Sequence, residues 1–430
     1  MMVAVKTAKS HLSFWLCDTN NQRNYKMQIF EAGEAKLLIN PKAEPDKIGG
    51  AAETVLNEEG FKAAYAEIST WPGYKETPLV SLDKYAKKLG VKAIYYKDES
   101  TRFGLDSFKA LGGAYAVCRL LLNKIREIAG EKATTKDLLD HKYDDIVSKI
   151  TVCSATDGNH GRSVAWGAQM FGAKCVIYIH AGVSEGRKEA IEKYGAKVIR
   201  CNGNYDDSVH DCADDAAKNG WFVISDTSYP GYMEVPCDVM HGYTVMVNEA
   251  LEQIPEHPTH TFVQGGVGGL AAAVSSRICC RMHKNRPLFT TVEPKNADCL
   301  YASIKNDEYT VIHGDLETIM AGLSCGEPSL LALEILKEYS TGFMTIPDTL
   351  IPVMMRDLAN KECADTPVVS GESGVSGLAG LVTACENPEF RKALKLDENS
   401  VVLLFSSEGA TDPAMYKEIV GKSAQDVVKA

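Results

Sequence analysis

Three short segments carry residue types that could do chemistry together. Residues 106–115 read D-S-F-K-A-L-G-G-A-Y, residues 154–162 read S-A-T-D-G-N-H-G-R, and residues 264–269 read Q-G-G-V-G-G. The first offers a lysine amine among apolar neighbours, and the other two are glycine-containing turns. An amine that can bond to an aldehyde and turns that can hold a phosphate suit a phosphate-bearing aldehyde cofactor, pyridoxal 5'-phosphate (PLP).

Lys109 is the candidate amine. A lysine bonds to an aldehyde only while its amine is neutral, and a desolvated or electropositive setting promotes this by lowering its pKa. Phe108 and Ala110 give it apolar neighbours, although an exposed helix lysine is the common alternative. Gly112 and Gly113 argue against exposure, because glycine costs about 1 kcal/mol relative to alanine in a helix. We predict that another group packs closely there.

The glycine turn lies between the predicted strand T-H-T-F-V and the predicted helix L-A-A-A-V-S-S-R-I. Glycines let backbone amides approach a ligand closely, and a helix start favours an anion. A plain tight turn explains this segment equally well. The spacing matches neither a dinucleotide-binding G-x-G-x-x-G motif nor a Walker motif.

The elements that must position these segments alternate between strand and helix. Between residues 150 and 225, the apolar runs I-T-V-C-S-A-T, K-C-V-I-Y-I-H, A-K-V-I-R-C and W-F-V-I-S are separated by helical stretches. This spacing is typical of β-α-β units and predicts a parallel sheet, which binds ligands at the carboxyl ends of its strands. We also predict a helix from Glu53 to Tyr65, while residues 1–49 resemble a loosely packed arm or extension.

Composition narrows the function classes. The chain has 430 residues, 45% of them hydrophobic and 24% charged, which is ordinary for a globular protein of two or three domains. A net charge of −11 argues against nucleic-acid or anionic-membrane partners. Without a membrane-spanning apolar run or a secretory signal, we expect a cytoplasmic location.

The 13 cysteines are irregularly spaced and fit reduced core thiols better than a disulfide framework. They form no zinc-binding pattern, so we expect no metal site. A disulfide bridge between Cys299 and Cys325 remains an alternative that the sequence does not decide.

The chemical segments also carry a resemblance. They are similar to those of the fold type II, tryptophan-synthase-β-like PLP enzymes, and more narrowly to the diaminopropionate ammonia-lyase family. The shared motifs between Gly73 and Tyr416 are K-D-E-S-x-R-F-G, F-K-x-L-G-G-A-Y-A, T-D-G-N-H-G-R, N-Y-D-D, Q-x-G-V-G, A-D-C, M-A-G-L-x-C-G-E-P, S-G-E-S-G and S-x-E-G-x-T-D. Only about the first fifty residues lie outside it.

The resemblance implies a role for each cofactor-binding residue. Lys109 would form the internal aldimine with Phe108 beside it, and Asn159 would hydrogen-bond the phenolic oxygen of PLP. Ser406, at the end of the strand V-V-L-L-F, would face the pyridine nitrogen. The phosphate would lie against the glycine turn, which comprises Gly265, Gly266, Val267, Gly268 and Gly269.

Two aspartates are the further catalytic candidates. Asp157 is a carboxylate where related serine and threonine dehydratases carry a small neutral residue, and the resemblance makes it the base for a D-substrate, with Lys109 the base for the L-form. A helix N-cap is the structural alternative for Asp157. Asp226 matches a family aspartate expected near the substrate, and a strand-end turn would explain it otherwise.

The implied reaction is elimination from D- and L-2,3-diaminopropionate to give pyruvate and two ammonia. A serine or threonine dehydratase and a non-catalytic PLP-binding protein are the rival interpretations. The implied architecture is a two-domain α/β homodimer with parallel-rich sheets and PLP in the interdomain cleft. An N-terminal extension would span residues 1–49, the large domain residues 50–115 and 230–430, and the small domain residues 116–229.

Overall fold

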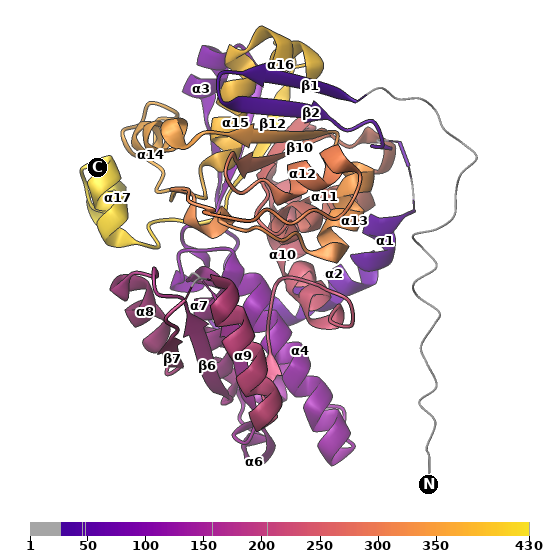
Figure 1. Ribbon diagram of the computed structural model, residues 1–430, viewed down its shortest axis with the longest axis vertical. Helices are drawn as coiled ribbons and strands as arrows, with labels where there is room; N and C mark the ends of the chain where they lie inside the picture. The colour runs from indigo at the N-terminus through magenta and orange to yellow at the C-terminus, as the bar shows by residue number, and fades with distance from the viewer. Residues whose placement is uncertain (1–26, 45, 48, 157, 204, 430) are drawn as a thin grey trace.

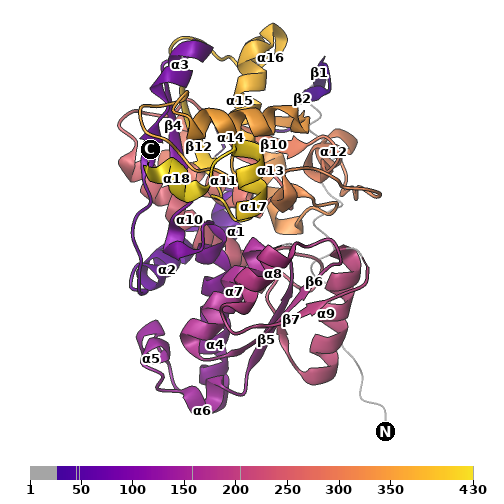
Figure 2. The ribbon, with the colours of Figure 1, turned by 90° about the vertical axis from the view of Figure 1, so that its left-hand side faces the viewer.

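The computed structural model describes residues 27–44, 46–47, 49–156, 158–203 and 205–429. It contains two β-sheets that lie in separate lobes (Figure 1, Figure 2). The strands of the larger sheet, in spatial order, are β1 (Gln28–Ala32), β2 (Ala35–Ile39), β11 (Gly342–Ile346), β10 (Leu288–Pro294), β9 (His260–Gln264), β12 (Val401–Ser406), β4 (Ala93–Asp98) and β3 (Leu79–Ser81). Those of the smaller sheet are β7 (Lys197–Arg200), β6 (Lys174–Ile179), β5 (Thr151–Ala155) and β8 (Phe222–Val223).

The larger sheet has a parallel centre. Strands β11, β10, β9, β12 and β4 run parallel, whereas β1, β2 and β3 pair antiparallel at its two ends. Along β12, Leu403 lies in one hydrophobic core and Leu404 in the other. Both faces of this strand are therefore buried, and its unbroken apolar run is typical of a central parallel strand.

The smaller sheet is parallel throughout, as the sequence predicts. Its strands come from residues 151–223, whereas those of the larger sheet come from residues 28–98 and 260–406. The larger lobe is thus assembled from both ends of the chain. The domain boundaries themselves stay a prediction.

Helices cover both sheets. In the first half of the chain they are α1 (Ala51–Val55), α2 (Glu58–Ile68), α3 (Asp83–Leu89), α4 (Lys109–Ala129), α5 (Thr135–Leu139), α6 (Asp144–Val147), α7 (Asn159–Phe171), α8 (Glu185–Glu192) and α9 (Tyr205–Asn219). In the second half they are α10 (Glu234–Gln253), α11 (Gly269–Met282), α12 (Cys299–Asn306), α13 (Leu330–Tyr339), α14 (Ile351–Ala359), α15 (Ser376–Glu386), α16 (Pro388–Ala393), α17 (Pro413–Val420) and α18 (Ala424–Lys429). Short 3-10 turns are η2 (Arg102–Gly104), η3 (His283–Asn285), η4 (Ala321–Leu323) and η5 (Asp348–Leu350).

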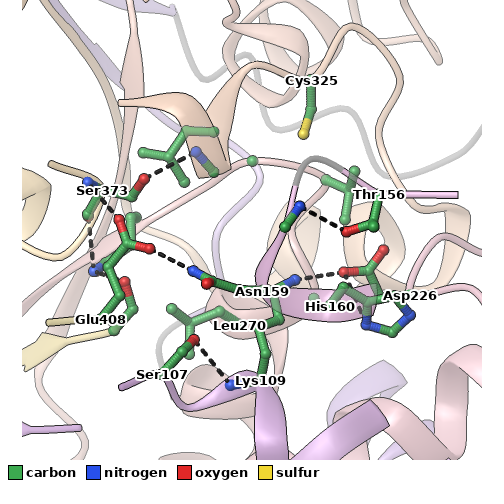
Figure 3. Close-up of a pocket in the computed structure, with 18 of the residues that line it drawn as sticks. Ser107, Lys109, Thr156, Asn159, His160, Asp226, Leu270, Cys325, Ser373 and Glu408 are labelled. Carbon is green, nitrogen blue, oxygen red and sulfur yellow. Dashed lines mark hydrogen bonds and ion pairs between the residues drawn. The ribbon is translucent and has the colours of Figure 1, made fainter. Parts of the chain in front are cut away.

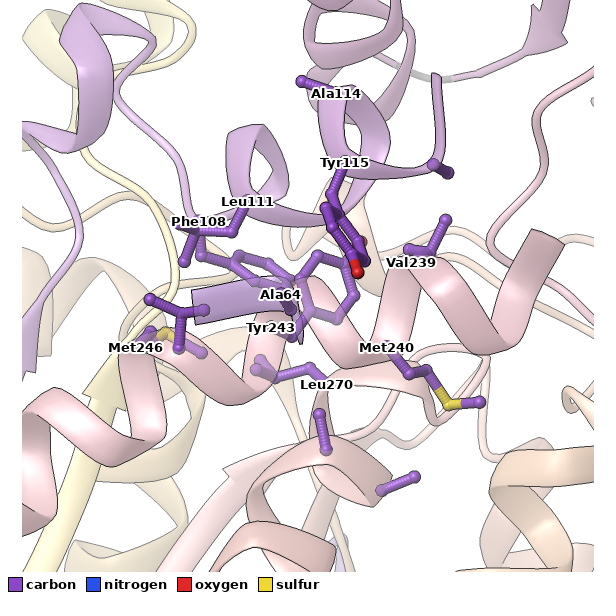
Figure 4. Close-up of a cluster of buried hydrophobic side chains, with 14 of the residues drawn as sticks. Ala64, Phe108, Leu111, Ala114, Tyr115, Val239, Met240, Tyr243, Met246 and Leu270 are labelled. Carbon is purple, nitrogen blue, oxygen red and sulfur yellow. The ribbon is translucent and has the colours of Figure 1, made fainter. Parts of the chain in front are cut away.

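Helix α4 links the two lobes and packs against both α7 and α10. A Cβ added at Gly112 would lie 2.3 Å from the Tyr243 ring, and one added at Gly113 would lie 1.9 Å from Ser163 Oγ. These glycines let the helices approach closely, which confirms the expectation of close packing. Tyr243 itself belongs to an apolar cluster beside the start of α4 (Figure 4).

Two sequence predictions need correction. The single helix expected from Glu53 to Tyr65 is two helices, because Asn57 accepts a hydrogen bond from Gly60 N and so caps the start of α2. The expected loose packing of the N-terminal arm does not hold for residues 28–39. These residues form a hairpin whose second strand pairs with β11, and Leu37 and Leu38 are fully buried.

None of the helices in the described residues is long and apolar enough to span a membrane. Cys299 and Cys325 are not joined by a disulfide in the structure.

Candidate active site

The three chemical segments meet at one cavity between the lobes (Figure 3). Its volume is about 910 Å³ including the open solvent at its mouth. Lys109 at the start of α4, Asn159 at the start of α7 and the glycine turn before α11 all line it.

Lys109 is paired with Asp226. Lys109 Nζ donates to Asp226 Oδ2, and this aspartate follows the last strand of the smaller sheet. Burial acts to lower the pKa of the Lys109 ammonium, but the Asp226 carboxylate outweighs it and the net shift is upward. Burial likewise opposes ionisation of Asp226, yet Lys109 holds the pKa of this carboxyl well below its usual range. The lowered lysine pKa expected from sequence is therefore wrong, because the sequence places Asp226 near the substrate but does not pair it with Lys109.

An apolar wall stands beside the pair, as the sequence predicts. The rings of Phe108 and Tyr243 lie with their centroids 4.5 Å apart, and Leu270 lies near them (Figure 4). Lys109 Nζ is 5.4 Å from the Phe108 centroid and 5.8 Å from the Tyr243 centroid. Tyr243 was not predicted from sequence, because it lies on α10, far along the chain from Lys109.

The segment before Lys109 is held to the end of β12. Phe108 N donates to Ser407 O at 3.0 Å, and Gly409 N donates to Asp106 O at 2.8 Å. These bonds form a short antiparallel bridge. The bridge fixes the start of α4, and therefore Lys109, against the larger sheet.

His160 approaches Asp226 from the start of α7. Its Nε2 lies 2.9 Å from Ile224 O, and since a carbonyl only accepts, Nε2 carries the proton and Nδ1 carries the lone pair of the neutral ring. His160 Nδ1 lies 3.8 Å from Asp226 Oδ2. Burial lowers the pKa of this imidazole, which favours its neutral form.

Asn159 is held at both ends of its side-chain amide. Asn159 Nδ2 donates to Glu408 Oε2 at 2.5 Å (Figure 3). Arg162 Nη2 donates to Asn159 Oδ1 at 3.3 Å. Glu408 follows β12 in the larger lobe, so the first bond joins the two lobes. The sequence marked Glu408 only as part of a glycine-rich motif.

The glycine turn has the shape that close approach to a ligand requires. Gly266 and Gly268 have φ angles of +58° and +99°, which favour glycine. A Cβ added at Gly265 would lie 2.7 Å from Glu293 Cγ. Helix α11 begins at Gly269, so its first backbone amides have no partner one turn earlier within the helix. Gly268 itself is not among the residues that line the cavity.

Comparisons with known proteins agree with this geometry. Residues 70–407 match the pyridoxal-phosphate-dependent enzyme family. The diaminopropionate ammonia-lyase of Escherichia coli K12 is 41% identical over 383 residues, which cover 87% of this chain and 95% of that protein. Its counterpart in Salmonella typhimurium is 39% identical over 391 residues, covering 87% of this chain and 96% of that protein.

Solved structures give the same result. The holo diaminopropionate ammonia-lyase of Escherichia coli matches with a TM-score of 0.82 and 36% identity, covering 91% of this chain and 98% of that chain. The chain belongs to the diaminopropionate ammonia-lyase family of PLP-dependent enzymes. The processed form of threonine deaminase isoform 2 from Solanum lycopersicum shares the fold, at 19% identity and a TM-score of 0.63 over 85% of this chain and 89% of that chain.

PLP is the cofactor of this protein, and the residues that line the cavity fit it. Beside the lysine and the glycine turn, three buried polar atoms lack a hydrogen-bond partner among the described residues: His160 Nδ1, Tyr243 Oη and Gln264 Oε1. All three residues line the cavity. A polar aromatic group with a phosphate would meet hydrogen-bonding atoms, an apolar wall and an amine.

The two remaining predicted site residues are Asp157 and Ser406. Asp157 lies outside the described residues. Ser406 is fully buried, but it does not line the cavity, and its hydroxyl lies 2.7 Å from Ser370 Oγ. Ser407 lines the cavity instead, with its Oγ accepting from Gln264 Nε2 at 2.9 Å. Ser406 is the last residue of β12 and Ser407 is the first residue beyond it, and their hydroxyls have different partners.

Arg102 lies in the loop that leads to Lys109 and is held by two carboxylates. Its guanidinium is fully buried and pairs with both Glu99 and Glu249. Lys97 completes this group through an ion pair of 2.7 Å with Glu249. The four charges anchor the loop that leads to Lys109.

Proposed function

We propose that this protein converts 2,3-diaminopropionate and water to pyruvate and two molecules of ammonia. Its relatives named diaminopropionate ammonia-lyase support this, as does an Escherichia coli structure in complex with an aminoacrylate-PLP azomethine reaction intermediate. The observation within this chain that carries the proposal is the Lys109–Asp226 pair, which lies in one cavity with the glycine turn.

The cavity residues would divide the binding of the cofactor. Bound PLP would supply an electron-withdrawing ring that spreads the charge left at the substrate α-carbon. Lys109 would attach to its aldehyde with Phe108 alongside, Asn159 Nδ2 would donate to its phenolic oxygen, and the glycine turn from Gly265 to Gly269 would hold its phosphate. Ser407, in place of Ser406, would face the ring nitrogen. A neutral hydroxyl leaves that nitrogen largely unprotonated, which suits elimination better than transamination.

Two bases would remove the α-proton. Lys109 would take it from the L-form, and Asp157 would take it from the D-form on the opposite face. The role of Asp157 rests on the sequence resemblance alone. Asp226 would stay anionic beside the lysine, and an anion there can hold the substrate β-ammonium before it leaves as ammonia.

Turnover of four amino acids by PLP-loaded enzyme tests this proposal. We expect release of pyruvate and ammonia from D- and L-2,3-diaminopropionate, well above the release from D- and L-serine. Lys109→Ala should lose at least about a thousandfold in turnover, in line with loss of a covalent catalyst. Asp157→Asn should lose the D-form selectively. Lys136→Ala, which removes an exposed lysine, is the matched control and should behave as wild type.

The rival functions predict different results. A serine or threonine dehydratase would prefer serine, and the Escherichia coli enzyme has been solved in complex with D-serine, which makes this comparison necessary. A non-catalytic PLP-binding protein would bind the cofactor and release ammonia from none of the four. Turnover that is indifferent to Lys109 would contradict the proposal outright.

We further propose a homodimer in the cytoplasm. The resemblance to the family supports the dimer, and cysteines that form no disulfide among the described residues support a reducing compartment. Sedimentation velocity of the purified protein would test the dimer, and a monomer at micromolar concentration would contradict it.

A further inference from the structure

Glu408 occupies an unusual position for a carboxylate, because it reaches the cavity from the larger lobe and is 4% exposed. Both of its oxygens accept hydrogen bonds. Oε1 accepts from Ser373 N at 3.0 Å, and Oε2 accepts from Asn159 Nδ2 at 2.5 Å and from Thr411 Oγ1 at 3.2 Å. No cation pairs with this carboxylate within 4 Å among the described residues, so these hydrogen-bond donors are what hold it in place.

The chemistry of these partners fixes which way the Asn159 amide faces. Arg162 has only donors, so it requires Asn159 Oδ1, while the Glu408 carboxylate has only acceptors, so it requires Asn159 Nδ2. The amide nitrogen carries two hydrogens, and Glu408 takes one of them. The other hydrogen remains to donate to a ligand in the cavity.

We propose that Glu408 is a positioning residue, which orients the Asn159 amide so that an N–H points at the phenolic oxygen of PLP. This inference rests on PLP binding and on the proposed contact between Asn159 and that oxygen. An oxygen that carries negative charge needs a donor, and a flipped amide would present a carbonyl instead. Glu408 therefore prevents a repulsive contact as well as providing an attractive one.

Glu408→Gln is a sharp perturbation because it keeps the shape and changes one acceptor into a donor. The backbone amide of Ser373 requires an oxygen, so the glutamine nitrogen is left facing Asn159 Nδ2, and two donors cannot bond. Asn159 must then flip or lose its partner. We expect the variant to bind PLP about threefold to tenfold more weakly, the range for losing one hydrogen bond. We also expect the visible absorption band of the bound cofactor to shift.

The measurement is a titration of wild-type and variant protein with PLP, followed by the absorption spectrum of each holoenzyme. Asn159→Ala and the double variant complete a mutant cycle. If Glu408 acts through Asn159, adding Glu408→Gln to Asn159→Ala changes the affinity by no more than about twofold and leaves the spectrum unchanged. Thermal unfolding of each protein verifies folding.

Glu372→Gln is the matched control. Glu372 is a second buried carboxyl that interacts electrostatically with Glu408, and it makes no hydrogen bond to Asn159 among the described contacts. It should leave the PLP spectrum unchanged. The proposal is overturned if Glu408→Gln binds PLP as wild type does, if its effect adds to that of Asn159→Ala, or if Glu372→Gln reproduces it. These readouts do not involve diaminopropionate, so a failure of the proposed reaction is distinguishable.

Discussion

The Lys109–Asp226 pair gives a prediction about stability. Both side chains are largely buried, at 21% and 14% exposed, and Asp226→Asn keeps the shape while removing the charge. Removing one partner of a buried pair costs about 3–5 kcal/mol. The unpaired lysine can instead become neutral by losing its proton. This deprotonation costs about 4.6 kcal/mol at pH 7 for an amine of ordinary pKa. We therefore expect Asp226→Asn to lower the free energy of unfolding by about 3–5 kcal/mol at neutral pH.

The pH dependence follows from the direction of each shift. The pKa of Lys109 is raised, so its contribution is fully present below the unfolded pKa of about 10.4 and is lost as the pH rises through the folded value. The pKa of Asp226 is lowered, so its contribution is present above about pH 3.9 and is lost as the pH falls through the folded value. In the Asp226→Asn variant, the buried Lys109 loses its proton well below the unfolded pKa. The free energy of unfolding of this variant therefore rises by up to about 1.4 kcal/mol per pH unit toward pH 10. The difference in the free energy of unfolding between wild type and Asp226→Asn should therefore be largest from about pH 4 to pH 7.

Urea unfolding of the cofactor-free proteins at pH 5, 7 and 9 measures this difference. Asp140→Asn is the matched control, because it breaks an exposed ion pair between Asp140 and Lys136. Exposed pairs contribute about 0–1 kcal/mol, so this variant should stay close to wild type at every pH. A difference below about 1 kcal/mol for Asp226→Asn, or one that does not narrow between pH 7 and pH 9, would refute the reasoning.

Four further variants test the scaffold around the site. Gly265→Ala should destabilise by about 1–3 kcal/mol in urea unfolding, because its Cβ meets the buried Glu293, whereas Gly266→Ala meets nothing closer than 3.5 Å and carries only the strain of a positive φ, about 1–2 kcal/mol. Unchanged stability in either variant would contradict this. Glu249→Gln should cost about 3–5 kcal/mol, since it removes the ion-pair partner of the buried Lys97 and leaves Arg102 with Glu99 alone, and a loss below about 1 kcal/mol would contradict this. Burial raises the pKa of Glu372 to about 7, so wild type should lose up to about 3 kcal/mol as the pH rises from about 4.5 to 7, and Glu372→Gln should abolish this dependence.

The smaller sheet could be predicted from the sequence because its signal is local. Each strand between residues 151 and 223 is a short apolar run, and a helix-length segment separates it from the next. The glycine turn was predictable for the same reason, since strand, turn and helix follow one another in the chain. The hairpin of residues 28–39 was not, because its burial depends on β11, which lies far along the chain at residues 342–346.

Site residues at the ends of strands are difficult to assign from sequence for a different reason. A strand presents alternate residues to its two faces, so a site residue at its end is identified only if the register is known. Ser406 and Ser407 are chemically identical candidates, and the sequence does not tell which one faces the cavity. The structure separates them, because Ser406 bonds to Ser370 and Ser407 bonds to Gln264.

The direction of the Lys109 pKa shift depends on a partner that is distant in the chain. Its apolar neighbours argue for a lowered pKa, and burial does act in that direction, but Asp226 lies 117 positions away and reverses the net shift. A buried carboxylate at short range outweighs desolvation, and no local pattern indicates that it will be there. Lys109 can therefore act as a nucleophile or base only after the proton held by this pair has been transferred.

Neighbouring residues at the start of α7 face different parts of the molecule. Asn159 bonds to Glu408 beyond the end of the larger sheet, while His160 faces Ile224 and Asp226 at the end of the smaller sheet. A movement of one lobe relative to the other would break the Asn159 contact and leave the His160 contacts intact, because α7 belongs to the smaller lobe. The Arg162 bond to Asn159 Oδ1 lies within α7 and would remain, so the Glu408 bond is the part of this arrangement that depends on how the two lobes sit.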